Sequence, residues 1–143
     1  MAQENNNNTY AGRRSRPEHV SQFDHGGRVP PRDNDLEEAV LGALMLEKDA
    51  YTVVCDILKP ESFYDTSNQK IYAAIQSLGA AQQSIDMLTV TEKLRLNGDL
   101  EAAGGALRIS ELTSRVASGA HVEFHARIVA QKYLARELIR FAS

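Results

Sequence analysis

Residues 118–143 read SGAHVEFHARIVAQKYLARELIRFAS, and this stretch predicts a long helix around which the fold is organised. No Gly or Pro interrupts it after Gly119. At about 100° per residue, its large apolar side chains fall on two faces of a helix. One face carries Phe124, Ile128, Leu138 and Ile139, and the nearly opposite face carries Val122, Val129 and Tyr133. A helix with two apolar faces is covered twice, so we expect its own domain on one face and a second partner on the other.

The composition is that of one folded domain. The chain has 143 residues, a net charge of −3 and 43% hydrophobic residues. No apolar run approaches the roughly 20 residues of a membrane span, and the N-terminus lacks the apolar segment of a secretory signal. The single cysteine, Cys55, cannot form an internal disulfide and lies in an apolar run, so we expect a buried thiol and a cytoplasmic protein.

Residues 1–32 are expected to be a disordered N-terminal tail, because they are rich in Asn, Arg, Gly and Pro and have few large apolar side chains. Five Arg against three acidic residues give this tail a charge of +2, and eleven basic against sixteen acidic residues give residues 33–143 a charge of −5. Nucleic-acid binding through the acidic part is therefore disfavoured. An alternative function remains open, in which Arg13, Arg14 and Arg16 of the tail bind nucleic acid.

Residues 33–117 are expected to form a globular helical bundle, and the fold class is all-α with about five to six helices. The first helix has its cap among residues 33–35 and ends near Glu47, and a short second helix is expected to be capped by Asp49 and to close before Pro60. The third begins at residues 65–67 and ends with Gly79 as the residue after the helix. Further helices are expected from Asp86 to Asn97, around Leu107, Ile109 and Leu112, and from a capping Ser118 onward. No segment predicts a convincing strand.

Motifs for enzyme chemistry are missing from the sequence. Neither a G-x-x-x-x-G-K-[ST] nor a G-x-G-x-x-G phosphate loop occurs. His121 and His125 have a spacing that can hold a metal, but no third ligand is near them and the H-E-x-x-H pattern is absent, which favours a surface pair. The adjacent Glu37 and Glu38 lie at a helix start, where the helix dipole accounts for them. The sequence thus predicts no catalytic, cofactor-binding or metal residue.

Five segments, taken in order, resemble the N-terminal domain of bacterial replicative DNA helicases of the DnaB family. The resemblance runs from about Arg28 to Ile139, and this length makes it specific. The segments are RVPPRDNDLEEAVLGALMLEKDAY (28–51), LKPESFYDTSNQKIYAAIQSL (58–78), IDMLTVTEKL (85–94), LEAAGGALRISELTSRVASGAHVEFHARIV (100–129) and QKYLARELI (131–139).

This resemblance implies a compact helical bundle followed by a helical hairpin. In the family, the domains pair through their hairpins and form a trimer of dimers, a collar on a hexameric ring that acts on DNA. The collar offers a surface to primase and, in some systems, to the helicase loader. ATP and Mg²⁺ belong to a separate RecA-like motor domain. Residues 118–143 are then expected to be a truncated first arm of the hairpin, and the chain a fragment without catalysis or cofactor of its own.

We therefore expect a non-catalytic assembly module that associates with itself through residues Phe124, Ile128, Tyr133 and Leu138 of the last helix. Arg127, Lys132 and Arg136 are expected to flank these contacts as orienting charges. Val122 and Val129 are favoured as the side that closes the bundle. The sequence leaves open which side of the helix faces its own core, which oligomer forms and which surface meets primase.

Overall fold

The computed structural model describes residue 30, residues 32–116 and residues 118–142. The tail predicted for residues 1–32, with Arg13, Arg14 and Arg16, therefore lies almost wholly outside the described residues. The described part holds six α-helices, one 3₁₀ turn and no strand, so the all-α prediction is confirmed. In chain order these are α1 (Asn34–Leu46), α2 (Ala50–Val54), η1 (Pro60–Ser62), α3 (Thr66–Ala80), α4 (Met87–Leu96), α5 (Gly105–Ser114) and α6 (Val122–Ala142).

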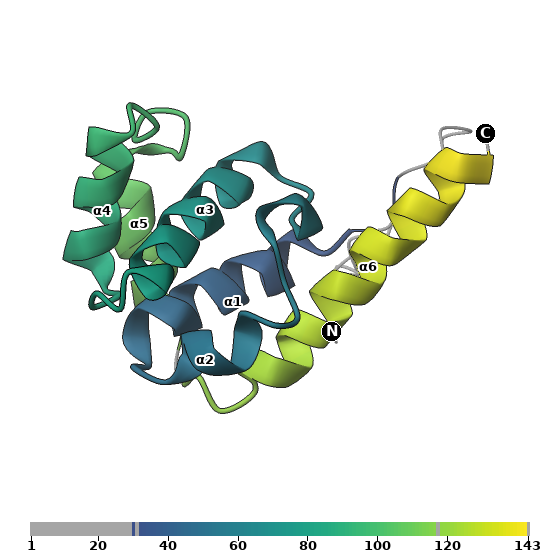
Figure 1. Cartoon of the computed structure of the whole chain (residues 1–143), viewed down its shortest axis with the longest axis horizontal. Helices are drawn as coiled ribbons and strands as arrows, with labels where there is room; N and C mark the ends of the chain where they lie inside the picture. The colour runs from purple at the N-terminus through teal and green to yellow at the C-terminus, as the bar shows by residue number, and fades with distance from the viewer. Residues whose placement is uncertain (1–29, 31, 117, 143) are drawn as a thin grey trace, which may run out of the picture.

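Helix α1 is the centre of the bundle, because it contacts each of the other five α-helices. Its start is fixed by the Asp33 side chain, which accepts a hydrogen bond from the Leu36 amide at 3.1 Å. Residues 40–45 of α1 are all buried. Gly42 allows α5 to approach closely, since a Cβ there would lie 2.3 Å from the Leu112 carbonyl oxygen. Figure 1 shows α4 and α5 at one end of the bundle and α6 at the other.

The core is almost entirely apolar and draws on all six α-helices. Phe63 and Tyr72 pack ring to ring with centroids 5.0 Å apart, and the Tyr72 hydroxyl donates to the Leu58 carbonyl at 2.9 Å. Burial is the main cause that raises the pKa of Tyr72, with neighbouring Tyr51 and Cys55 adding to it. None of the described helices combines the length and apolarity that a membrane crossing requires.

Several expected details of α2 and α3 are wrong. Asp49 precedes α2, but its side chain makes no capping hydrogen bond, and the helix ends at Val54. Cys55 is half-buried rather than buried, and its thiol donates to the Thr52 carbonyl. Helix α3 continues through Gly79 to Ala80, so Gly79 is not the residue after the helix. Gly79 instead makes room for Tyr51, because a Cβ at Gly79 would lie 2.1 Å from the Tyr51 ring.

The last two helices also differ from the expectation. Leu107 points away from the core and is 71% exposed, whereas Ile109 and Leu112 are buried as expected. Helix α6 begins at Val122, four residues after Ser118. Ser118 instead accepts from the Ala120 amide, and the Val122 amide donates to the Gly119 carbonyl, a three-residue step that makes this segment a turn.

Candidate protein-interaction surface

Helix α6 has 21 residues, which corresponds to a length of roughly 31 Å at ~1.5 Å per residue. Its first half packs on the bundle through the buried side chains of Val122, Ala126 and Val129, and it contacts α1, α2 and η1. The inner face favoured from the sequence, with Val122 and Val129, is therefore confirmed. The second half extends away from the bundle (Figure 1).

A buried carboxylate fixes the segment on which α6 rests. Glu37 of α1 is 1% exposed and accepts hydrogen bonds from the amides of Tyr64 and Asp65 at 2.8 and 3.3 Å. Its Oε1 also accepts from the Asn68 side-chain amide at 3.1 Å. Asn68 in turn accepts from Arg108 of α5 at 2.6 Å. One charge therefore joins α1, the start of α3 and α5, and holds Tyr64 in place.

Two tyrosines and three cations alternate along the inner edge of α6. The Arg32 guanidinium lies 4.6 Å from the centre of the Tyr64 ring, and Arg136 lies 5.4 Å from Tyr64 and 5.7 Å from Tyr133. The Lys59 ammonium lies 5.2 Å from the Tyr133 ring. These distances are within the range of cation–π attraction. The cation–π ladder, as we call these five residues, is one of the places where the domain holds the middle of α6.

Arg136 is the central member of the cation–π ladder. Its guanidinium also donates to the Ser62 carbonyl of η1 at 2.9 Å, which ties α6 to the connector between α2 and α3. Burial lowers the pKa of Arg136, and nearby Glu37, Tyr64 and Tyr133 act in the opposite direction. The side chain remains a cation at neutral pH because the ordinary pKa of arginine lies far above 7.

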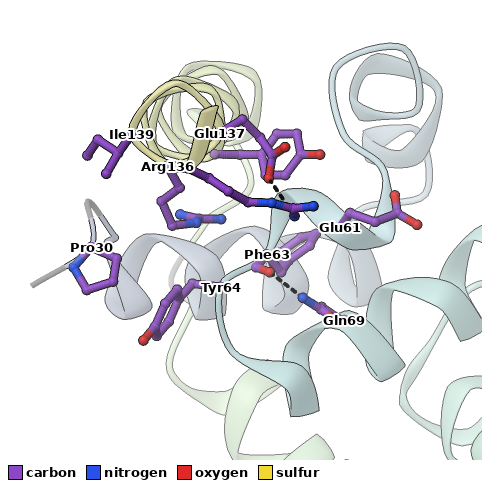
Figure 2. A pocket seen from close by; sticks show the side chains of 10 residues that line it. Pro30, Glu61, Phe63, Tyr64, Gln69, Arg136, Glu137 and Ile139 are labelled. Atoms are coloured by element: carbon purple, nitrogen blue, oxygen red, sulfur yellow. Dashed lines mark hydrogen bonds and ion pairs between the residues drawn. The ribbon is translucent and has the colours of Figure 1, made fainter. Parts of the chain in front are cut away.

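An open groove of about 770 Å³ lies beside the ladder, between α6 and the η1–α3 connection. Figure 2 shows the ring of Tyr64 and the side chains of Glu137 and Ile139 around it. A hydrogen bond of 2.8 Å from Gln69 to the Phe63 carbonyl fixes the connector on the side opposite α6. The groove is lined by Pro30, Glu61, Phe63, Tyr64, Gln69, Tyr133, Arg136, Glu137, Ile139 and Arg140.

The outer face of α6 carries a continuous row of mostly apolar side chains, which we call the outer stripe. Its members recur at alternating steps of four and three residues, the spacing by which one helix packs along another. Phe124 and Leu138 are 64% and 63% exposed, so the described part of the chain leaves this row largely uncovered. The outer stripe consists of Phe124, Ile128, Gln131, Ala135, Leu138 and Ala142.

The structure separates the four residues expected to make self-contacts. Phe124, Ile128 and Leu138 belong to the outer stripe, with Ile128 half-buried and the other two exposed. Tyr133 lies on the inner side of α6, where Lys59 and Arg136 contact its ring. Sequence spacing already placed Tyr133 opposite Phe124, and this signal was sufficient to separate them.

The charges expected to flank the contact also differ in their surroundings. Arg127 is exposed and pairs with Glu123 one helical turn away at 2.9 Å. Arg136 belongs to the ladder on the inner side. Lys132 is half-buried. The ladder itself was missed from the sequence, because its members come from three distant parts of the chain.

The described part of the chain contains no cluster of three or more His, Cys, Asp or Glu side chains placed to bind a metal ion. His121 and His125 lie with ring centres 6.2 Å apart without a third ligand group. The sequence also contains neither of the two phosphate-loop motifs.

Comparison with known proteins gives consistent matches. The model of the DnaB-like helicase N terminal domain matches residues 29–131. The replicative DNA helicase DnaB of Rhodothermus marinus is 50% identical over 125 residues, which are 87% of this chain and 13% of that protein. The replicative DNA helicase DnaC of Bacillus subtilis (strain 168) is 39% identical over 116 residues, 81% of this chain and 26% of that protein. The chain thus spans a small part of the length of these relatives.

Two solved structures share the fold. The crystal structure of the N-terminal domain of DnaB helicase from Mycobacterium tuberculosis matches with a TM-score of 0.77 and 37% identity, over 80% of this chain and 79% of that one. A DnaB-like replicative helicase, described with its interactions with primase, matches with a TM-score of 0.69 and 28% identity, over 77% of this chain and 26% of that one. By its sequence, its helices and these matches, the chain belongs to the family of DnaB-like helicase N-terminal domains.

Proposed function

We propose that this chain is the non-catalytic collar domain of a hexameric replicative DNA helicase, in which it pairs subunits and provides a docking surface. The observation that supports this most directly is the outer stripe, an exposed apolar row along a helix that extends beyond its own bundle. Its steps of four and three residues suit a second helix packed alongside. Pairs of domains, three to a ring, would form the collar.

The energetics favour weak pairing through one helix alone. Burying a large apolar side chain contributes about 1.5–3 kcal/mol when it starts fully exposed. The two large apolar side chains of the outer stripe that are mostly exposed, Phe124 at 64% and Leu138 at 63%, would together contribute roughly 2–4 kcal/mol per copy when fully covered. Association itself costs about 4–15 kcal/mol. We therefore expect an association that grows with concentration.

The proposed docking partner is primase. Its support is the likeness to the DnaB-like replicative helicase whose structure is described with its interactions with primase. A helicase loader is a second candidate partner, and DNA would be reached through the assembled ring. In this proposal ATP and Mg²⁺ act in a separate motor domain. A role in bacterial replication implies the cytoplasm.

Light scattering of this chain, alone and with the helicase-binding domain of primase, tests the docking proposal. We expect the mixture to contain a complex with the mass of this chain plus one bound primase domain. An unrelated domain of similar size and charge serves as the control for nonspecific binding. A mixture whose components keep their separate masses at the highest attainable concentration would contradict primase docking.

A further inference from the structure

The groove beside the cation–π ladder has the properties of a peptide site. Its volume of about 770 Å³ is within the roughly 300–1,000 Å³ of typical binding pockets. Aromatic and aliphatic walls come from Tyr64, Tyr133 and Ile139. Charges of both signs are interspersed among them, with Glu61 and Glu137 near Arg136 and Arg140. Such a mixed lining suits an extended segment with apolar side chains and charges of both signs.

The position of Pro30 points to one occupant. Pro30 lines the groove, so the chain passes along this site just where residues 1–29 join the bundle. We propose that residues 23–29 of the same chain, FDHGGRV, occupy this groove and hold the distal half of α6 against the domain. A segment tethered within a few residues of a site is present there at an effective concentration of about millimolar. A separate peptide or a second copy does not have this advantage.

The length and backbone of residues 23–29 fit the groove. The lining runs along α6 from Tyr133 to Arg140, a rise of seven residue steps or roughly 10 Å along the helix axis. Seven residues of extended chain reach about 23 Å, so the segment spans this distance with residues to spare. A residue before proline is restricted to extended backbone, which favours this path at Val29. Gly26 and Gly27 permit close approach to the helix.

The side chains of the segment complement the lining. Phe23 and Val29 offer apolar surface to the walls that the aromatic residues and Ile139 provide. Asp24 is a carboxylate for the two groove-lining arginines of α6, Arg136 and Arg140, and Arg28 is a cation for Glu61 or Glu137. Residues 1–22 match less well, because they contain the run of four asparagines and the cluster of Arg13, Arg14 and Arg16.

A disulfide test can decide whether Phe23 reaches the groove. In a Cys55→Ser background, which removes the only native thiol, we compare Phe23→Cys combined with Ile139→Cys against Phe23→Cys combined with Leu134→Cys. Ile139 lines the groove and is 48% exposed, whereas Leu134 is 59% exposed and does not line it. Leu134, the control position, is therefore at least as accessible to solvent as Ile139 but lies outside the groove on the same helix.

Under mild oxidation at low protein concentration, we expect the Ile139 pair to form an intrachain disulfide at least about tenfold faster than the Leu134 pair, since only the former gains effective concentration from the groove. Nonreducing gels and peptide mapping identify the products. Equal rates for the two pairs would overturn the proposal. Disulfide-linked dimers as the main product would also overturn it, because the segment would then come from a second copy.

Hydrogen exchange gives a second measurement that needs no cysteine. In the Phe23→Asp variant of the full chain, we expect amides of residues 137–142 to exchange faster than in the unchanged chain, while residues 40–45 keep their protection. Ser21→Asp is the matched control, because it adds the same charge two residues outside the proposed occupant. Unchanged exchange at residues 137–142 in Phe23→Asp would contradict the proposal that residues 23–29 hold the distal half of α6.

Discussion

Replacing the buried carboxylate of Glu37 by an amide, in the variant Glu37→Gln, tests how the bundle supports α6. The two side chains have nearly the same shape, so the change leaves no cavity and isolates the hydrogen bonds. Glu37 is 1% exposed and accepts through both oxygens, from Tyr64 at one and from Asp65 and Asn68 at the other. We expect a clear loss of stability with the fold retained.

The magnitude follows from these bonds. A glutamine can offer only one oxygen, so if its oxygen serves Asp65 and Asn68, its amide group faces the Tyr64 N–H and leaves that donor unpaired. A buried unpaired donor costs about 1–3 kcal/mol. The other two bonds lose their charge assistance, which removes roughly another 1 kcal/mol. The expected decrease in the free energy of unfolding is therefore about 2–4 kcal/mol.

Urea unfolding followed by circular dichroism measures this decrease. With a slope of about 1–3 kcal/mol per molar urea, the midpoint should fall by roughly 1–2 M. Glu101→Gln is the matched control, because Glu101 is exposed and a surface change of this kind usually alters stability by less than about 0.5 kcal/mol. Equal midpoints for the two variants would refute the account of Glu37 as the link between α1, α3 and α5.

Three further predictions concern packing, capping and a buried hydroxyl. Gly42→Ala, which would stabilise an ordinary helix interior, should destabilise by about 1–3 kcal/mol in thermal unfolding, because its Cβ would meet the Leu112 carbonyl; a raised melting temperature would contradict the close approach. Burial raises the pKa of the Asp65 carboxyl, but its hydrogen bonds from Ser67 and the charge of Arg108 outweigh this and leave the pKa below its ordinary value of 3.8. The Asp65 carboxylate thus stabilises the folded protein above pH 3.8 and loses this effect as the pH falls through its folded-state pKa. The difference in unfolding free energy between the unchanged chain and Asp65→Asn, measured by urea unfolding, should therefore hold from pH 7 to 5 and close below pH 3.8. A difference that stays constant down to pH 3 would contradict the capping role of the carboxylate. Tyr72→Phe should cost about 1–2 kcal/mol by leaving the Leu58 carbonyl unpaired, and an unchanged urea midpoint would show that this bond contributes nothing.

Local signals in the sequence predicted most of the helices. Caps were expected among residues 33–35, among residues 65–67 and at Asp86, and the caps are Asp33, Asp65 and Asp86. An acidic side chain beside orphan amides acts within a few residues, which makes it visible in the sequence. Helix ends were harder to predict. Gly79 looked like a stop signal, yet it serves the contact with Tyr51, which lies 28 residues away. Such a use depends on tertiary packing, which no local pattern contains.

The candidate surface was predictable to the same extent. Helical spacing separated the inner face, with Val122 and Val129, from the outer stripe. The alternation of cations and tyrosines was not predictable, since Arg32, Lys59, Tyr64 and Arg136 meet only after the bundle has folded. The same holds for the groove, because η1 and α6 are about seventy residues apart in the chain.

The central claim is that the outer stripe of α6 pairs subunits, and sedimentation equilibrium over a wide concentration range tests it most directly. We predict that the average mass of the chain rises above 15.8 kDa with concentration, and that Ile128→Asp keeps it at 15.8 kDa while circular dichroism stays helical. Leu107→Asp, at a 71% exposed leucine of α5, should associate as the unchanged chain does. An unchanged chain that stays at 15.8 kDa throughout, or an Ile128→Asp variant that associates equally well, would contradict the claim.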